Sequence, residues 1–297
     1  MAHSDAAASR RNAGLLARTP SPGLVLGAIG SVQFGSAIAA TLFAQVGPAG
    51  SVLLRLVSAT IVLMALYRPQ VRGSSRRELA LAARFGLVRA GMNLSFYEAI
   101  HRIPLGIAVT IEFVGPLAVA VAGSRRKLDF LWVALAAAGI LALTHTGGHG
   151  IDGLGVVLAL VAGSLWATYI LVNARVGRVF AGGTGLALAM CVGSVAVLPA
   201  GIAAGGSHLL DPRSLALGAA VGMLSSAIPY SFELEALRRI PPSVFGVLMS
   251  IEPAMAALAG FIVLGQGLGL RALLGIALVV AASVGASQRS TEAPVAI

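Results

Sequence analysis

Ten runs of about twenty apolar residues, separated by short basic clusters, are the feature of this sequence that most limits its fold. A helix needs about 20 predominantly apolar residues to cross the hydrocarbon core of a bilayer. With 57% hydrophobic and only 11% charged residues in 297, the chain has too few polar residues for a water-exposed surface. The sequence therefore excludes a disulfide scaffold, a disordered chain, a coiled coil and almost any soluble enzyme. It indicates a polytopic membrane protein.

The apolar runs are expected to be helices. They lack the alternation of barrel strands, and open sheets leave backbone groups unpaired in lipid. The sequence thus predicts an all-α membrane protein with ten transmembrane helices, at 23–44, 48–67, 79–100, 104–122, 128–146, 153–174, 184–204, 214–236, 242–264 and 270–288.

The basic residues predict the orientation of the chain and explain its net charge of +10. If the N-terminus is cytoplasmic, the inner segments hold 15 Lys and Arg residues and the outer loops hold three. This excess places both termini in the cytoplasm and favours contact with anionic lipid. The basic residues form no single stripe with aromatic residues beside it, so a nucleic-acid partner is not expected. The oligomeric state is not indicated by any sequence feature.

An internal repeat divides the chain into two halves. The stretch EAIHRIP (98–104) recurs as EALRRIP (235–241), an offset of 137 (235 − 98). We expect a first repeat at 23–146 and a second at 153–288, with cytoplasmic tails at 1–22 and 289–297. Because each repeat has an odd number of five crossings, the two must be inverted relative to each other. Inverted repeats are typical of secondary transporters, whose sites lie near the membrane midplane.

Two glutamates at the expected midplane are the first candidates for function. Glu112 and Glu252 lie about 12 and 15 Å into their spans at 1.5 Å per residue. Pro116 cannot donate to the carbonyl of Glu112, and Pro253 frees the carbonyl of Met249. A carboxyl group at that depth is costly, so each is either a substrate and proton site or a protonated hydrogen-bonding group between the repeats.

Other buried charges are weighed against structural roles. Glu233 is a third candidate, and Arg55 either binds a substrate carboxylate through its bidentate fork or neutralises a glutamate. Glu98 and Glu235 stand four residues before Arg102 and Arg239, the spacing of a structural ion pair on a helix.

Arg84 can extend its side chain to the interface and is expected to be structural. Arg89, in the middle of its span, has no role that the sequence assigns. Candidates for lining a polar cavity are Gln33, Asn93, Tyr97, Glu98, Trp166, Tyr169 and Tyr230.

The sequence contains no motif for a metal, a cofactor or ATP. It has no HExxH, no GxxxxGK[ST] and no nucleophile elbow, and the single Cys191 has no cysteine partner. We therefore expect no cofactor, no metal and no catalytic residue. A membrane-embedded enzyme, which also keeps acids at depth, remains the alternative from another class of protein.

Several stretches resemble a known family. PLGIAVTIEFVGPLAVAVAGSRRKLDFLWV (104–133), PYSFELEAL (229–237) and LMSIEPAMAALAGFIVLG (248–265) are similar to EamA-type members of the drug/metabolite transporter superfamily. QFGSAIAATLF (33–43) and VLLRL (52–56) fit as well. Within this superfamily the chain resembles the bacterial threonine/homoserine exporters over 23–288.

The resemblance implies a ten-helix inverted-repeat protein of the bacterial inner membrane that exports small amino acids in exchange for protons. It also implies that Arg55, Glu112, Glu233 and Glu252, which stand at positions that are polar in these exporters too, bind substrate or couple transport to protons. The sequence departs from the exporters at a few positions, because Glu98, Glu235, Arg84 and Arg89 look like additions and Gln266 replaces a common glutamate. Export of another metabolite or of a drug-like cation is the alternative within the superfamily.

Overall fold

The computed structural model describes residues 19–69, 75–122, 127–144, 151–180, 183–237, 239–240 and 242–289, and these residues form helices and short connections without a strand. The elements are α2 (Ser21–Ala40), α3 (Phe43–Tyr67), α4 (Arg76–Arg102), α5 (Leu105–Glu112), α6 (Val114–Ala122), α7 (Lys127–Thr144), α8 (Gly153–Val179), α9 (Thr184–Gly205), the 3-10 segment η1 (Gly206–Leu210), α10 (Pro212–Gly222), the π segment η2 (Met223–Ala227), α11 (Ile228–Leu237), α12 (Pro242–Met249), α13 (Glu252–Leu264) and α14 (Leu270–Arg289).

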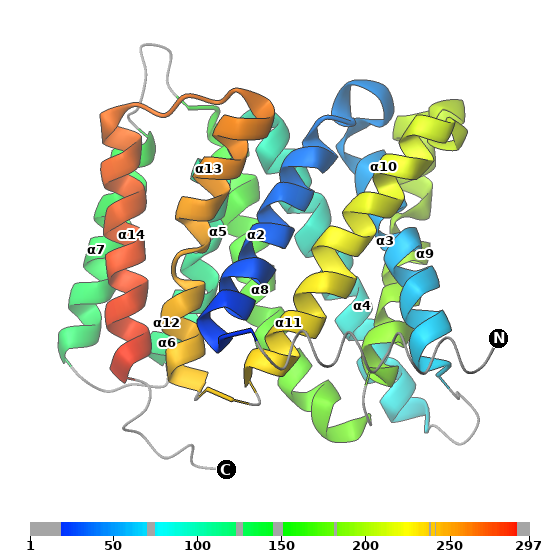
Figure 1. Cartoon of the computed structure of the whole chain (residues 1–297), viewed down its shortest axis with the longest axis horizontal. Coiled ribbons are helices and arrows are strands. Elements are labelled where there is room, and N and C mark those ends of the chain that lie inside the picture. Colours follow the sequence, from blue (N-terminus) through cyan, green and yellow to red (C-terminus); the bar gives the residue numbers. More distant parts are fainter. Residues whose placement is uncertain are drawn as a thin grey trace.

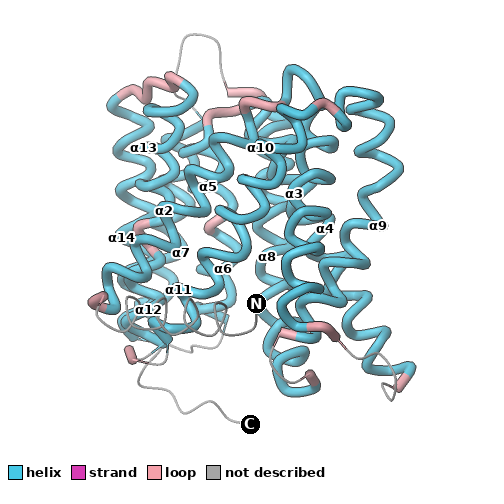
Figure 2. Tube along the Cα trace, turned by 45° about the vertical axis from the view of Figure 1, so that its right-hand side comes forward, coloured by secondary structure: helices cyan, strands magenta, loops and turns pink. Residues whose placement is uncertain are grey.

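The helices run up and down in one bundle (Figure 1). The α2–α3, α4–α5, α9–α10 and α13–α14 connections lie at the upper end in that view, and the helix ends next to residues 70–74, 181–182 and 238–241 lie at the lower end. Figure 2 shows the same two layers of connections from another side. The lower end therefore carries the helix ends beside which the sequence places clusters of arginines.

Side-chain polarity is inverted relative to a soluble protein. Large apolar side chains face outward, with 64% of Ile61, 67% of Leu66 and 63% of Phe261 exposed. Charged side chains lie inside, and only 7% of Arg55 and 6% of Glu252 is exposed. An apolar exterior around a polar interior is the arrangement that a bilayer requires.

Among the described residues, five helical segments are long and apolar enough to cross a membrane: α2, α3, α8, Thr184–Leu210 and Val244–Leu264. Shorter apolar helices lie at Leu105–Val119, Leu131–Ala142 and Leu270–Gly285. The all-α membrane fold is thus confirmed. Helix α4 is long enough to cross a membrane, but it is less apolar than these helices because it carries several charged residues between Arg76 and Arg102. The count of ten crossings stays a prediction.

Several helix ends follow directly from the local sequence. Ser75 and Glu78 form a capping box at α4, in which Ser75 N donates to Glu78 Oε2 (2.7 Å) and Glu78 N donates to Ser75 Oγ (3.3 Å). Helix α3 is kinked at Gly47, whose φ of 67° and ψ of 170° are readily adopted only by glycine, and Pro48 restarts the helix. These features set where each helix enters the bundle.

Two helices are interrupted in mid-bundle. Helix α5 ends at Glu112, Phe113 forms a turn, and α6 begins at Val114. Helix α12 ends at Met249, and α13 begins at Glu252, with Pro253 in its first turn. Each interruption thus brings one of the two predicted midplane glutamates to a helix end.

Helices from the two halves of the chain pack on each other rather than separately. Helix α3 lies against α9 and α10, α4 against α8 and α9, α2 against α11 and α13, α5 and α6 against α8, α5 against α13, and α7 against α14. The central core is therefore shared between the halves.

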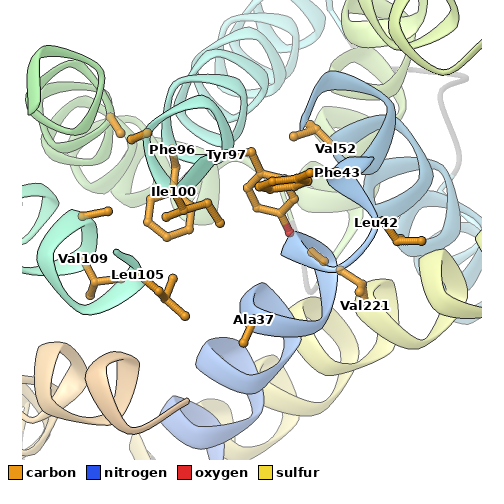
Figure 3. Packing of buried hydrophobic residues seen from close by; sticks show 14 of the residues in the cluster. Ala37, Leu42, Phe43, Val52, Phe96, Tyr97, Ile100, Leu105, Val109 and Val221 are labelled. Atoms are coloured by element: carbon orange, nitrogen blue, oxygen red, sulfur yellow. The ribbon is translucent and has the colours of Figure 1, made fainter. Parts of the chain in front are cut away.

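Part of a large apolar core cluster lies towards the upper end of the bundle, between α2, α3, α4, α5 and α10, and Figure 3 shows its packing. Phe43 packs against Tyr97 and His101, with ring centroids 5.8 and 5.6 Å apart. Leu105 and Val221 are buried to 1% exposure or less. We call this the upper apolar cluster; its labelled members in the figure are Ala37, Leu42, Phe43, Val52, Phe96, Tyr97, Ile100, Leu105, Val109 and Val221.

Candidate functional site

A cavity of about 240 Å³ lies inside the bundle, below the upper apolar cluster. It reaches Leu63, Leu186 and Glu233, which lie near the lower ends of α3, α9 and α11. Its polar and charged lining residues come from both halves of the chain: Gln33, Ser36, Arg55, Arg89, Asn93, Glu112, Trp166, Tyr169, Ser225, Ser226, Glu233 and Glu252.

The structure brings most of the candidates predicted from sequence into this one cavity. Arg55, Glu112, Glu233 and Glu252 all line it, as do Gln33, Asn93, Trp166 and Tyr169.

Two cavity candidates have other positions, and the side chain of a third is not described. Tyr97 is fully buried behind Arg55, with which it shares a hydrogen bond, and Glu98 lies near the upper end of α4 with 35% of its side chain exposed. The side chain of Tyr230 lies outside the described residues.

Arg55 is held by the protein at one edge only. Its Nη1 donates to the hydroxyl of Tyr97 (3.1 Å), its Nη2 donates to the carbonyl of Ser225 (3.4 Å), and its guanidinium carbon lies 5.6 Å from the Tyr97 ring centroid. Its buried Nε has no partner. Arg55 lines the cavity with one guanidinium nitrogen unpaired, and an arginine whose hydrogen bonds are not all used inside the protein can bind an anionic group.

Pro229 explains how the backbone reaches Arg55. Proline has no N–H, so Pro229 cannot donate to the carbonyl of Ser225, four residues before it. The chain responds with the π segment η2, in which the N–H of Ile228 donates to the carbonyl of Met223. The released carbonyls of Leu224 and Ser225 accept hydrogen bonds from Ser31 Oγ (2.6 Å) and Arg55 Nη2 (3.4 Å). The sequence signal was the Ser-Ser-Ala-Ile-Pro stretch, whose π geometry we did not predict.

The glutamates occupy different local environments. Gln33 Nε2 donates to Glu252 Oε1 (3.0 Å), while Glu252 Oε2 is buried without a partner. Glu252 also lies in the first turn of α13, where the helix dipole favours a carboxylate. Glu112 interacts electrostatically with Glu252 and Arg55, and Glu233 with Arg89.

Arg89 has surroundings similar to those of Arg55. Its Nη1 donates to the hydroxyl of Tyr169 (3.4 Å), its guanidinium carbon lies 5.6 Å from the Tyr169 ring centroid, and its Nε has no partner. Asn93 Nδ2 donates to the backbone carbonyl of Arg89 (2.8 Å). Within the described part of the chain, neither Arg55 nor Arg89 forms an ion pair with a carboxylate. Sequence reasoning assigned Arg89 no role, because its neighbours come from another helix.

The two ion pairs predicted from i, i+4 spacing are confirmed. Glu98 and Arg102 are 4.0 Å apart, and Arg102 also lies 3.5 Å from Asp152. Glu235 and Arg239 are in direct contact through Glu235 Oε1 and Arg239 Nη2. Both pairs lie near helix ends and outside the cavity lining.

In the described residues, no group of three or more His, Cys, Asp or Glu side chains is arranged to hold a metal ion. The cavity instead offers unpartnered buried polar atoms on Gln33, Arg55, Arg89, Ser225, Ser226 and Glu252. Because a buried polar atom without a partner is costly, this set is suited to a small polar solute that both donates and accepts hydrogen bonds.

A bundle with an apolar surface around a cavity lined by charged side chains is the arrangement of a membrane transport protein, and comparison with known proteins gives the family. The EamA-like transporter family matches residues 153–288. The chain is 42% identical to the threonine/homoserine exporter RhtA of Salmonella typhimurium and 41% identical to RhtA of Escherichia coli K12, covering 89% of this chain and 90% of each relative. The chain belongs to the EamA-like transporter family.

More distant matches agree with this assignment. An uncharacterized transporter of Bacillus subtilis, YwfM, is 28% identical over 52% of this chain and 53% of its own length. A crystal structure covering 91% of this chain and 99% of its own has a TM-score of 0.63 at 17% identity, which shows a shared fold.

Proposed function

We propose that the protein exports small amino acids such as threonine or homoserine from the cytoplasm in exchange for protons. The observation that carries the proposal is the cavity itself, which is lined by two arginines without an ion-pair partner and by three glutamates, of which Glu112 and Glu252 are buried. An amino-acid zwitterion presents one carboxylate and one ammonium group. The cavity offers a matching group for each, and the similarity to the named exporters supports the substrate class.

The proposed cycle follows from these charges. A zwitterion reaches the cavity from the lower end, where Arg55 binds its carboxylate and Glu112, Glu233 or Glu252 binds its ammonium. A proton arriving from the opposite side neutralises a glutamate and weakens the contact with the ammonium group. The substrate is then released as the helices move about the interruptions at Phe113 and Ser250.

We further propose ten crossings arranged as two inverted repeats, 23–146 and 153–288, with cytoplasmic tails at 1–22 and 289–297. The helix contacts support this division. If each helix of one repeat is replaced by its equivalent in the other repeat, every contact should have a counterpart. The α4–α8 contact then corresponds to α2–α11, the α4–α9 contact to α3–α10, and the α2–α13 contact to the packing of α5 and α6 on α8. All these pairs are in contact. The interruptions at Phe113 and Ser250 are also 137 positions apart (250 − 113). In this proposal the lower end is the cytoplasmic face of a bacterial inner membrane.

The test is counterflow in proteoliposomes that contain the purified full-length protein. Labelled threonine and homoserine are expected to enter vesicles preloaded with the same unlabelled amino acid, and a proton gradient is expected to drive their accumulation. A panel with other amino acids, metabolites and cationic drugs is measured in parallel. If only a cationic drug or another metabolite shows counterflow, the substrate is not an amino acid. If a proton gradient drives no accumulation, transport is not coupled to protons.

A further inference from the structure

Two arginine–tyrosine pairs have their arginine in the cavity lining, and only one of them is used in the cycle above. Arg55 with Tyr97 and Arg89 with Tyr169 have hydroxyl contacts of 3.1 and 3.4 Å and the same 5.6 Å distance from guanidinium to ring. In each pair the arginine Nε is buried without a partner. The second pair is therefore as well prepared to bind an anionic group as the first.

Each arginine has a glutamate of its own. Arg55 interacts electrostatically with Glu112, and Arg89 does so with Glu233. The fifth charged group, Glu252, interacts electrostatically with both Glu112 and Glu233, so it is linked to both sets. Each set offers one cationic and one acidic side chain, as a zwitterion requires.

The two sets lie at different heights in the bundle. Tyr97 and Arg89 are both on α4, eight residues apart (97 − 89), which corresponds to a rise of about 12 Å. Arg55 and Glu112 are buried to 7% exposure beneath the upper apolar cluster. Arg89 and Glu233 are only partly buried, and Glu233 is close to the lower end of α11. A solute arriving from the lower end meets the Arg89 set first.

We propose that Arg89, positioned by Tyr169, and Glu233 form a second amino-acid subsite that binds the zwitterion before it moves up to Arg55 and Glu112. The inference rests on the proposed function, because it takes a small amino acid as the solute. The substrate carboxylate binds the guanidinium of Arg89 and the ammonium group binds Glu233. Glu252, which accepts a hydrogen bond from Gln33 at 3.0 Å, lines the same cavity as the two subsites.

The fluorescence of Trp166 can report whether an amino acid occupies the cavity. It lines the cavity, one turn before Tyr169 on α8, and its ring packs edge-on against Phe113 at 5.6 Å, beside Glu112. The chain has two tryptophans, and the other, Trp132, packs in a separate cluster of α6, α7 and α14. A Trp132→Phe background of the full-length protein in lipid nanodiscs therefore leaves Trp166 as the only tryptophan.

In that background, titration with threonine is expected to change Trp166 fluorescence in two saturable phases. Arg89→Gln is expected to lower the threonine affinity of one phase at least tenfold and to leave the other phase unchanged. The unchanged phase also shows that the variant is folded. Arg89→Lys is expected to restore part of the loss. Arg84→Gln is the matched control, since Arg84 is on the same helix but exposed and outside the cavity lining.

Transport kinetics separate a binding role from a structural one. Arg89→Gln is expected to raise the half-saturating threonine concentration for export about tenfold while the maximal rate changes less than twofold. If Arg89→Gln behaves like Arg84→Gln in both assays while the wild type transports amino acids, the second subsite is refuted and the proposed function stands. If the wild type neither binds nor transports any small amino acid, both are refuted.

Discussion

Gln33 on α2 and Glu252 on α13 are joined by a hydrogen bond of 3.0 Å between Gln33 Nε2 and Glu252 Oε1, although they are 219 positions apart. The second carboxyl oxygen of Glu252 and the amide oxygen of Gln33 are buried without partners. The pair thus links the two halves of the chain at a carboxyl group that has one oxygen without a hydrogen-bond partner.

Replacement of this carboxyl group tests the coupling. Glu252→Gln keeps the size of the side chain and a hydrogen-bonding oxygen for Gln33 but cannot exchange a proton. We expect proton-driven accumulation to fall at least tenfold, whereas exchange of labelled for unlabelled amino acid is retained in part. The same split is expected for Glu112→Gln. Accumulation at the wild-type rate in both variants would show that neither glutamate couples transport to protons.

Tyr97 is expected to matter for substrate affinity although it is outside the cavity lining. Tyr97→Phe keeps the ring over Arg55 and removes the hydroxyl that accepts from Nη1. Hydrogen bonds to charged groups contribute about 1.5–3 kcal/mol, so the guanidinium loses much of its fixed orientation. The half-saturating concentration is expected to rise roughly tenfold. An unchanged concentration together with a lowered Tm would instead make the contact purely structural.

Gly163 on α8 lies against the interruption that carries Glu112. A Cβ atom at Gly163 would lie 2.5 Å from the carbonyl oxygen of Glu112 and 3.2 Å from its Cα. Gly163→Ala must therefore displace the α5–α6 interruption, and overpacking of this kind costs about 1–3 kcal/mol. We expect a lower Tm and reduced transport.

The matched control for that variant is Gly177→Ala, on the same helix. A Cβ atom there meets nothing within 4 Å, so neither stability nor transport is expected to fall. Equal effects of the two substitutions would mean that close packing at Glu112 is not the reason why glycine stands at 163.

Asp152 at the start of α8 predicts a pH dependence of stability. Its carboxylate accepts from the N–H groups of Leu154 (2.8 Å) and Gly155 (3.3 Å), and these bonds, with Arg102 nearby, hold the pKa of Asp152 below its usual range. A group whose pKa is lowered by folding stabilises the fold above its unfolded pKa of about 3.9, and this stabilisation is lost as the pH falls through the folded value.

Thermal unfolding at pH 7 and at decreasing pH checks this expectation. Asp152→Ala is expected to lower Tm at pH 7 by on the order of 2 °C, and the difference from the wild type should shrink towards pH 3. Asp211→Ala is the comparison, because the Asp211 side chain makes no capping bond to α10. A difference that stays constant with pH would show that the carboxylate charge is not involved.

Much of this fold follows from local sequence. The apolar runs, the capping box at Ser75, and the Glu98–Arg102 and Glu235–Arg239 pairs depend on residues within one turn or one run. The depth of a glutamate in its span is also local information, and for this reason the sequence alone identifies Glu112 and Glu252 as candidates. Their presence in one cavity agrees with that reasoning, and their roles remain proposals.

The features that sequence reasoning missed depend on contacts between helices. Nothing near Arg89 in the sequence identifies Tyr169, which is 80 positions away, and nothing near Arg55 identifies the carbonyl of Ser225, 170 positions away. Pro229 indicates that a backbone carbonyl loses its helical N–H donor, but it does not indicate which side chain will donate to that carbonyl instead. Helix packing decides that, and residue spacing along one helix does not encode it.

The upper apolar cluster has a consequence for the energy supply of a cell. A polar cavity that reached both ends of the bundle would hold a continuous file of water, and protons would pass along it without any solute. Phe43, Tyr97 and Leu105, each at most 9% exposed, pack together in this region above Arg55. In the proposed cycle, the same side chains that stabilise the bundle would also prevent protons from crossing the membrane without a solute while the cavity is loaded.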